Sequence, residues 1–342
     1  MDVIVPCAGL SSRFPGMRPK YLLIDFSKKL MVERALVKTP GKKHIVLLRE
    51  HVNLYDAEAI IRDCFGDVVN IIILETPTQG PAETVYQALM RLNLSGPFMV
   101  RDCDSFFDMR TVDGNAVHTS TLSENLNLAG AAALSYVIQN DQGTITNIVE
   151  KQVVSDTFCV GAYQFASADE YKTAYTSLKT FGKELFISNI ISYMISQGQI
   201  FNTAPVKNYV NVGTLKEWLA FNDRPTIVCD IDGVVCYSQS SLGSNSYDRK
   251  QYTPIQKNVD TLHKYMSREC KIVFMTARPY EFKNVTRKML NELGFGECEL
   301  IMDINHAKRI IINDFAGSNP YPSCEAVNLE RNSDKLNLLL KD

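Results

Sequence analysis

Short apolar runs alternate with helical patterns along this chain of 342 residues, and polar or glycine-containing stretches follow the runs. The first run is Val3-Ile4-Val5, and Pro6 ends it. Residues 83–92 carry apolar side chains at the i, i+3, i+4 and i+7 spacing of an amphipathic helix. Such alternation is typical of βαβ units, in which helices cover a parallel sheet. The sequence therefore predicts a layered α/β fold.

The predicted strands are short and rich in β-branched and aromatic residues. In the first part of the chain they cover residues 3–5, 44–48, 69–74, 98–100 and 134–137. The run Asn222-Asp223-Arg224-Pro225 interrupts the pattern, which then starts again with predicted strands over 226–230, 271–275 and 309–312. We therefore predict two domains, residues 1–222 and 223–342, as the length of the chain also suggests.

The composition is that of an ordinary globular protein, with 45% hydrophobic and 22% charged residues and a formal net charge of −2. This balance gives no reason to expect nucleic acid or an acidic membrane surface as a partner. No apolar run approaches the roughly 18 residues of a membrane span, and no signal-peptide pattern is apparent. The nine cysteines form no CxxC pair, which favours reduced thiols over structural zinc. We expect a cytoplasmic protein.

The stretch PCAGLSSRFPGMRPKYLL follows the first strand and is rich in small and cationic residues. Gly9 permits a tight turn in which successive N–H groups point at one anion. Ser11 and Ser12 add hydroxyl donors, and Arg13 and Lys20 supply charge that suits a polyphosphate. The stretch is not a P-loop, because GxxxxGK[ST] is absent. The alternative is a surface turn with solvated charges.

This stretch resembles the N-terminal signature of the sugar-nucleotide pyrophosphorylases, nucleotidyltransferases that include enzymes found with capsule biosynthesis genes. The resemblance continues in chain order through Gln79-Gly80-Pro81-Ala82-Glu83-Thr84, Asp104-Ser105-Phe106-Phe107, Val149-Glu150-Lys151, Val160-Gly161-Ala162-Tyr163, and Val210-Asn211-Val212-Gly213-Thr214 with Trp218. It implies a Rossmann-like domain with a mixed sheet. The implied reaction transfers a nucleotidyl group from a nucleoside triphosphate to a sugar phosphate or related phospho-compound and releases pyrophosphate.

The same resemblance assigns roles to individual residues. Arg13 and Lys20 would be catalytic and hold the triphosphate; Ala8, Gly9, Ser11, Ser12, Gln79 and Gly80 would bind the nucleotide; Glu150, Lys151 and Gly161 would meet the sugar phosphate; and Asp104 and Asn211 would bind Mg²⁺. The family usually has aspartate where this chain has Asn211, whose amide brings no charge. Asn211→Asp is therefore expected to preserve or raise the activity. Asp102 and Asp104 also form a DxD, the pattern of metal-dependent glycosyltransferases, which is a rival interpretation.

The second domain begins with an apolar strand that ends in Asp230-Ile231-Asp232-Gly233. Carboxylates two residues apart at a strand end point to the same side, where both can bind one Mg²⁺. This run resembles motif I of the haloacid dehalogenase superfamily phosphatases, Met275-Thr276-Ala277-Arg278 resembles motif II, and Ile310-Ile311-Ile312-Asn313-Asp314 resembles motif IV. The resemblance implies a Rossmann-like domain with a minimal cap. Asp230 would be the nucleophile that forms an aspartyl-phosphate, Asp232 the general acid/base, Thr276 and Ala277 phosphate ligands, and Asp314 a third magnesium ligand.

The sequence does not decide which residue is the phosphate-binding lysine of this second site, nor which segment forms its lid. Lys308 is the candidate by sequence, but in a strand over 309–313 it would lie about 18 Å from Asp314, which makes Arg278 the second choice. The gaps between the motifs are too short for a full cap domain. A lid would then come from the neighbouring domain, from a second subunit of a homo-oligomer, or from a flap over 237–252, unless that segment is a plain surface loop.

Together these features predict a bifunctional enzyme of activated-sugar synthesis, for capsule or surface polysaccharide. A phosphatase that destroyed the transferase's own substrate would be futile, so it should remove a different phosphate. Two alternatives stay open. One is a DxD glycosyltransferase joined to a phosphatase; in the other, one domain has become a regulatory or binding module.

Overall fold

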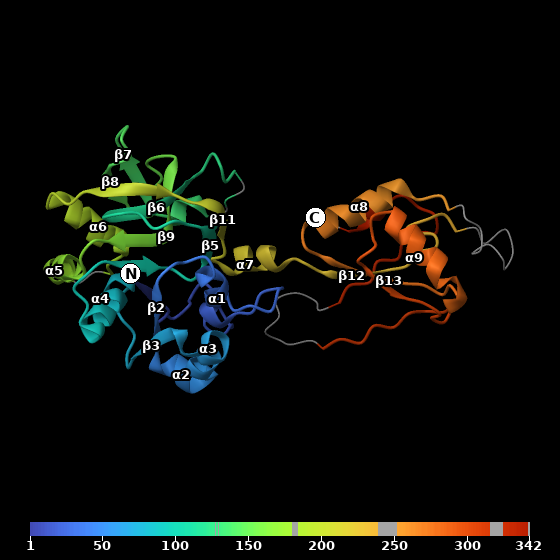
Figure 1. The fold of residues 1–342 in the computed structure, drawn as a ribbon, viewed down its shortest axis with the longest axis horizontal. Coiled ribbons are helices and arrows are strands. Elements are labelled where there is room, and N and C mark those ends of the chain that lie inside the picture. Colours follow the sequence, from blue (N-terminus) through green and yellow to red (C-terminus); the bar gives the residue numbers. More distant parts are fainter. Residues whose placement is uncertain (127, 129, 180–183, 239–251, 315–323, 341–342) are drawn as a thin grey trace. The chain divides into compact units, whose positions relative to one another are not determined.

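The computed structural model describes residues 1–342 except 127, 129, 180–183, 239–251, 315–323 and 341–342. The chain forms two compact units, Met1–Asn222 and Asp223–Asp342. Each unit has its own sheet with helices packed on it (Figure 1). The predicted α/β class is confirmed, and the large sheet of the first unit is mixed.

The first unit contains a nine-stranded sheet and a small two-stranded one. Its strands are β1 (Asp2–Pro6), β2 (Lys42–Leu48), β3 (Val69–Leu74), β4 (Phe98–Arg101), β5 (Ser105–Asp108), β6 (Asn115–Thr121), β7 (Tyr136–Gln139), β8 (Ile145–Val149), β9 (Thr157–Phe165), β10 (Phe201–Pro205) and β11 (Lys207–Asn211). The large sheet has the order β10-β6-β9-β4-β1-β2-β3, with β7 and β8 added beside β9. Strands β4, β1, β2 and β3 are mutually parallel, whereas β9 runs antiparallel to β4.

Helices cover both faces of this sheet (Figure 1). They are α1 (Met31–Leu36), α2 (Arg49–Tyr55), α3 (Ala57–Phe65), α4 (Pro81–Leu92), α5 (Ala168–Leu178), α6 (Ile187–Ser196) and α7 (Leu215–Asn222), with the 3₁₀ turns η1 (Lys20–Leu22), η2 (Gly66–Val68) and η3 (Ala131–Ala133). Side chains of α4, α5 and α6 pack in one core with Ile4, and those of α1 and α3 pack in another with Val3 and Val5. The unbroken apolar run in β1 is thus explained, because its side chains are buried on both faces of the sheet.

The second unit has a parallel three-stranded sheet with the order β12-β13-β14. Its elements are β12 (Thr226–Cys229), α8 (Gln256–Ser267), β13 (Lys271–Met275), η7 (Tyr280–Phe282), α9 (Lys283–Glu292), β14 (Glu299–Ile301) and α10 (Leu336–Leu339). Its core joins these strands to α8, α9 and α10 through residues such as Leu262, Phe274 and Leu290. The unit therefore has a hydrophobic core of its own.

The prediction of a strand over 309–312 is wrong. These residues form no strand, and the side chains of Ile310, Ile311 and Ile312 are 74%, 59% and 92% exposed. Their β-branched composition favours a strand, but β propensity is realised only where a neighbouring strand and a covered face are available. β14, which was not predicted from the sequence, pairs with β13 instead. The predicted strand over 134–137 is displaced to β7, Tyr136–Gln139.

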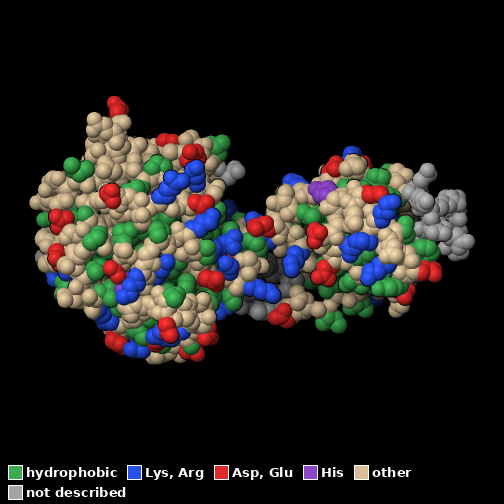
Figure 2. Space-filling view, viewed as in Figure 1, with side chains coloured by type: hydrophobic (Ala, Val, Ile, Leu, Met, Phe, Trp, Pro, Cys, Tyr) green, Lys and Arg blue, Asp and Glu red, His purple; other side chains and the backbone are tan. Residues whose placement is uncertain are grey.

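Acidic and basic side chains are interspersed on both units over the face shown in Figure 2. This mixture agrees with a formal net charge near zero. Among the described residues, no helix has the length and apolar character needed to cross a membrane.

His118 lies inside β6 with 1% of its surface exposed, and neither ring nitrogen has a hydrogen-bond partner among the described residues. Burial, together with the nearby charge of Arg101, lowers the pKa of His118 to about 4. The unfolded chain takes up this proton near pH 6.5, so protonation favours unfolding. The free energy of unfolding should therefore fall by about 3 kcal/mol between pH 6.5 and pH 4 because of this group.

Denaturant unfolding of the wild type and of His118→Leu at pH 7 and pH 4.5 measures this contribution. The wild type should lose more stability than the variant at the lower pH, since leucine has no proton to bind. His306→Asn serves as the control, because His306 is exposed in the second unit. An unchanged pH dependence in His118→Leu would show that His118 is not the group responsible.

Candidate functional site

The loop after β1 is closed by Ser11, which adopts a left-handed conformation with φ of 53°. Its hydroxyl oxygen accepts a hydrogen bond from the Lys20 N–H at 3.0 Å, which fixes Lys20 beside the start of the loop. Gly9, expected to provide the tight turn, has a φ outside the left-handed region and open space around it. The turn is therefore made at Ser11, where this local hydrogen bond supports the conformation. Ala8 is buried, and Gly9 and Ser12 are exposed.

Two cations of this loop converge on Asp104. Lys20 Nζ lies 2.6 Å and Arg13 Nη2 3.3 Å from Asp104 Oδ2. Burial alone would raise the pKa of Asp104, but the charges of Lys20 and Arg13 overcome it and hold the pKa below its ordinary value. Burial would likewise lower the pKa of Lys20, yet the Asp104 carboxylate raises it above its usual value. Asp104 and Lys20 therefore both carry their charges at neutral pH.

Arg101 determines the path of the turn that carries Asp104. Its guanidinium is fully buried and donates to the carbonyl oxygens of Asp102 and Ser105 at 2.6 and 2.7 Å, and to that of Ala35 at 3.3 Å. It also donates to the Ser105 hydroxyl at 3.1 Å. Arg101 was not predicted from the sequence, where it has the pattern of an ordinary strand-end residue. Its bonds show it to be the group around which residues 102–105 fold.

Asp102, the other carboxylate of the DxD, faces a different neighbour. Its N–H donates to the Gly161 carbonyl at 2.8 Å, and a Cβ at Gly161 would lie 2.8 Å from Asp102 Oδ2. Gly161 also has a φ of 84°, so only glycine suits this position in β9. Burial, with the charge of Asp104, raises the pKa of Asp102 to about 7. The two carboxylates thus have opposite pKa shifts and different contacts.

Asn211, at the end of β11, faces the same space as Asp104. A Cβ built on Gly213 would lie 3.2 Å from both Asn211 Oδ1 and Asp104 Oδ2, and 3.4 Å from Arg13 Nη1. The glycine therefore leaves a small gap between two oxygen donors and a cation. Oxygen ligands of this kind suit Mg²⁺, which takes one or two protein ligands and completes its shell with phosphate and water. Within the described part of the chain, no cluster of three or more His, Cys, Asp or Glu side chains offers a metal site.

Sequence reasoning missed Glu217, which is part of the same arrangement. Asn211 Nδ2 donates to Glu217 Oε1 at 2.6 Å, while Glu217 Oε2 accepts from the Thr214 N–H at 2.9 Å and from its hydroxyl at 2.8 Å. Thr214-Leu215-Lys216-Glu217 has the pattern of a capping box at the start of α7, a signal that was readable in the sequence.

The remaining predicted residues of the first unit lie around residues 185–188. Gly80 is the N-cap of α4, exposed Gln79 precedes it, and the Ala82 N–H donates to the Leu185 carbonyl at 3.2 Å. Beyond β8, Glu150 accepts from the Ser188 hydroxyl at 2.5 Å and from the Ser135 hydroxyl.

Lys151 places its ammonium 4.0 Å from the centre of the Phe186 ring and has a φ of 53°. The contacts thus bring together Arg13, Lys20, Asp104 and Asn211 as one group. Gly80, Glu150 and Lys151 meet the 185–188 segment instead.

In the second unit, two parallel strands end in the residues of the predicted phosphatase site. Asp230 follows β12, and the buried Thr276 and the half-buried Ala277 follow β13. Arg278 binds both oxygens of Asp232, at 2.7 and 2.8 Å, and Arg309 Nη2 lies 3.3 Å from Asp230 Oδ2. Both carboxylates are thus paired with arginines.

Lys308 and Asp314 lie on the exposed segment that forms no strand. The expectation that a strand length separates them therefore loses its basis, and Arg309 is the cation that reaches Asp230. Arg278, the alternative phosphate ligand, is occupied by Asp232. Most of the predicted flap over 237–252 lies outside the described residues, which resume at 252 after 238.

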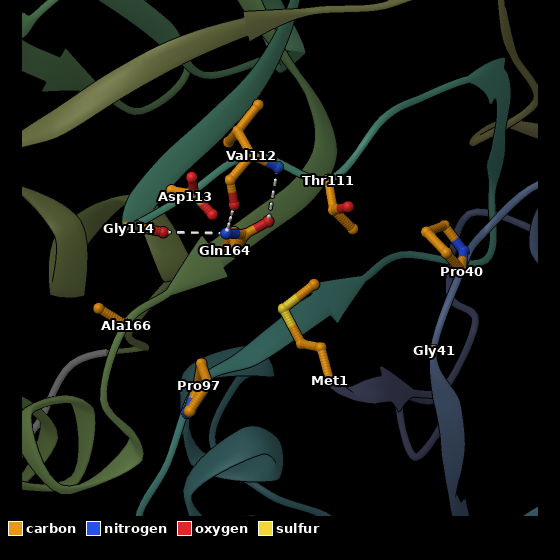
Figure 3. Close-up of a pocket in the computed structure, with 10 residues that line it drawn as sticks. All are labelled: Met1, Pro40, Gly41, Pro97, Thr111, Val112, Asp113, Gly114, Gln164 and Ala166. Atoms are coloured by element: carbon orange, nitrogen blue, oxygen red, sulfur yellow. Dashed lines mark hydrogen bonds between the residues drawn. The ribbon is translucent and has the colours of Figure 1, made fainter.

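A pocket of about 450 Å³ lies at the end of the large sheet where β1, β2 and β4 begin (Figure 3). Met1, Gly41 and Pro97 line it, and each precedes a parallel strand, whereas the Arg13, Lys20 and Asp104 group lies beyond strand ends. The Gln164 amide in this pocket bonds to the backbone of Val112 and Gly114. None of the predicted site residues lines this pocket.

Solved structures of nucleotidyltransferases share this fold. A nucleoside-diphosphate-sugar pyrophosphorylase from Vibrio cholerae RC9 has a TM-score of 0.54 and 21% identity, over 64% of this chain and 98% of that one. The inositol-1-phosphate CTP transferase from T. maritima has a TM-score of 0.50 and 16% identity, over 63% and 90%. A UDP-glucose pyrophosphorylase complexed with UDP-glucose has a TM-score of 0.50 and 14% identity, over 64% and 96%.

At these identities the likeness establishes a common fold. No protein-family model matches the sequence, and no curated protein matches it. The matched share of the chain is similar in size to the first unit.

Gly213→Ala tests whether the gap between Asp104 and Asn211 holds a cation. The added methyl would occupy the gap, and its neighbours need to move only by a few tenths of an ångström. We expect the free energy of unfolding to change by less than about 1 kcal/mol, while Mn²⁺ binding, followed by electron paramagnetic resonance, falls at least tenfold. The matched control is Gly96→Ala, since a Cβ there meets nothing within 4 Å. Unchanged Mn²⁺ binding in Gly213→Ala would place the cation elsewhere.

Proposed function

We propose that the first unit transfers a nucleotidyl group from a nucleoside triphosphate to a sugar phosphate or related phospho-compound, with release of pyrophosphate. The observation that carries this proposal is the convergence of Arg13 and Lys20 on Asp104, beside Asn211 and the gap at Gly213. Two long cationic side chains next to oxygen ligands match the needs of a metal-bound triphosphate. The common fold with the pyrophosphorylase and CTP transferase structures supports it.

The reaction needs positioning and charge neutralisation more than proton transfer. A phosphate oxygen of the acceptor attacks the α-phosphorus, a new P–O bond forms, and the bond to the β-phosphate bridging oxygen breaks. Arg13 and Lys20 bind the negative oxygens of the triphosphate and its leaving pyrophosphate, and Lys151 binds the acceptor phosphate. Asp104 and Asn211 would hold Mg²⁺, which supplies further neutralisation of the phosphate charge when bound.

The rival glycosyltransferase reaction predicts that both carboxylates of the DxD serve one metal. Here Asp102 faces Gly161 while Asp104 faces Lys20, so their contacts favour separate roles. The products also separate the two reactions. A nucleotidyltransferase consumes a nucleoside triphosphate and releases pyrophosphate, whereas a glycosyltransferase consumes a nucleotide sugar and releases a nucleoside diphosphate.

For the second unit we propose a phosphatase in which Asp230 attacks phosphorus and forms an aspartyl-phosphate that water then hydrolyses. The supporting observation is that Asp230 and Thr276 follow neighbouring parallel strands, where ligands of α/β folds usually bind. Arg309, beside Asp230, is the better candidate than Lys308 for the cation that binds the phosphate. Asp232 would exchange protons with the leaving group once it is released from Arg278.

The two activities together would serve activated-sugar synthesis. The resemblance of the first loop to capsule-associated enzymes supports the use of the activated sugar in capsule or surface polysaccharide. The phosphatase would remove a phosphate other than the one that the transferase needs. A lid over Asp230 would come from the first unit or from a second copy of the chain, which is why we propose a homo-oligomer. If one unit were only a binding or regulatory module, the reaction proposed for that unit would not be detected with any of the substrates tested.

Arg13→Ala and Lys20→Ala should each reduce kcat/KM for pyrophosphate release by about 10²- to 10³-fold, because each removes a charge from the polyphosphate. Release is measured with the four common nucleoside triphosphates against a panel of sugar phosphates. Lys38→Ala is the matched control: it also removes a lysine from an ion pair, but the partner is Asp108 and the pair is exposed. Pyrophosphate release that survives both loop substitutions would contradict the triphosphate role.

Asp230→Asn should lower phosphate release from an aryl phosphate or a sugar bisphosphate by about 10⁴-fold, since an amide cannot act as the nucleophile. Pyrophosphate release by the first unit should continue at its normal rate, because the two units have separate cores. Asp260→Asn, an exposed position on α8, should change neither rate. Retained phosphate release in Asp230→Asn would rule out the aspartyl-phosphate route.

A further inference from the structure

Asn211 has only one orientation that satisfies its hydrogen bonds. Its amide nitrogen donates to Glu217 Oε1 at 2.6 Å, and its oxygen accepts from the Gly213 N–H at 3.2 Å. Since only the nitrogen can donate to the carboxylate, the oxygen must face the gap that it shares with Asp104 Oδ2. The orientation of Asn211 is therefore set by the charge of Glu217.

Glu217 is itself fixed and cannot turn away without cost. Its second oxygen accepts two hydrogen bonds from Thr214, and its own N–H donates to the Thr214 hydroxyl at 3.3 Å. These reciprocal bonds cap the first turn of α7, and Trp218 in the same turn is buried in the core of the first unit. Moving Glu217 would uncap this helix.

We propose that Glu217 is a positioning residue. It orients the side chain of Asn211 so that a neutral amide, rather than a carboxylate, provides the metal ligand at position 211. The Glu217 carboxylate accepts the hydrogen bond of the Asn211 amide nitrogen, and this bond turns Asn211 Oδ1 toward the cation. This inference rests on the proposed function, because it takes Asp104 and Asn211 as the residues that hold the metal.

An aspartate at 211 would place a second carboxylate against Glu217 Oε1, where an amide now donates at 2.6 Å. Two carboxylates at such a distance repel each other and neither can donate a hydrogen bond, so either the side chain at position 211 or that of Glu217 would move away. Either outcome removes the oxygen from the gap or uncaps α7. The expectation that Asn211→Asp preserves or raises the activity is therefore reversed.

A charge swap tests this arrangement. Mn²⁺ binding is measured by electron paramagnetic resonance for the wild type, Asn211→Asp, Glu217→Gln and the double variant. Asn211→Asp should bind Mn²⁺ at least about tenfold more weakly, because the group that orients the metal ligand no longer holds its oxygen toward the gap. The double variant should return to within about threefold of the wild type, because the amide introduced at position 217 donates to the carboxylate introduced at position 211 and still accepts from the Thr214 N–H.

Two controls separate the ways in which this can fail. Ser167→Ala removes the cap of α5, where the Ser167 hydroxyl accepts from the Glu170 N–H at 3.3 Å, so it should lower the Tm without changing Mn²⁺ binding. Asp104→Asn should weaken Mn²⁺ binding in every background. If it does not, the metal assignment of the proposed function is wrong and this inference falls with it. If Asp104→Asn weakens binding but Asn211→Asp binds as tightly as the wild type, or the double variant shows no recovery, only the role of Glu217 is overturned.

Discussion

The buried guanidinium of Arg101 is the interaction on which the first unit's candidate site depends. A fully buried charge is costly unless its donors are satisfied, and Arg101 satisfies its terminal nitrogens with three carbonyl oxygens and one hydroxyl. Burial still lowers its pKa to about 10. Because those acceptors lie in α1, in the turn after β4 and at the start of β5, the guanidinium ties a helix to the segment that carries Asp104. The position of Asp104 follows from this backbone arrangement.

Asp104 is surrounded by two cations and by one neutral amide. Lys20 and Arg13 neutralise its carboxylate from one side, and their loop is closed by the Ser11 hydroxyl. From the other side the chain provides an amide, Asn211, whose orientation is set by Glu217. The site thus combines long cationic side chains from one loop with oxygen donors fixed by backbone and helix capping. This division suits a reaction in which charge moves between phosphates while the ligands of the cation stay in place.

The candidate site of the second unit also lies where parallel strands end, but its charged side chains are paired differently. Its polar residues also follow the ends of parallel strands, but each of its two neighbouring carboxylates meets an arginine. The Asp230 carboxylate becomes available to a substrate only when Arg309 moves to another anion. Phosphate is such an anion, because arginine binds it with two parallel hydrogen bonds. In the proposed phosphatase reaction, the phosphate of the substrate would compete with Asp230 for Arg309 and so release the Asp230 carboxylate.

The sequence by itself determined the features that depend on neighbours along the chain. The strands at 69–74 and 271–275 and the α/β alternation could be predicted because short runs rich in β-branched and aromatic residues favour strands. The positions of Arg13 and Asp104 in loops after β1 and β4 followed from the pattern of strands. The grouping of Arg13 and Asp104 with Lys20 and Asn211 followed from the resemblance. Tertiary structure alone decided which of these side chains meet. It replaced Gly9 by Ser11 as the turn residue and left 309–312 without a strand partner. It also gave Asn211 its orientation through Glu217. The strand partner depends on groups distant in the chain. The turn at Ser11 and the orientation of Asn211 depend on side-chain hydrogen bonds, to the Lys20 N–H and to Glu217, that the spacing of apolar residues does not predict.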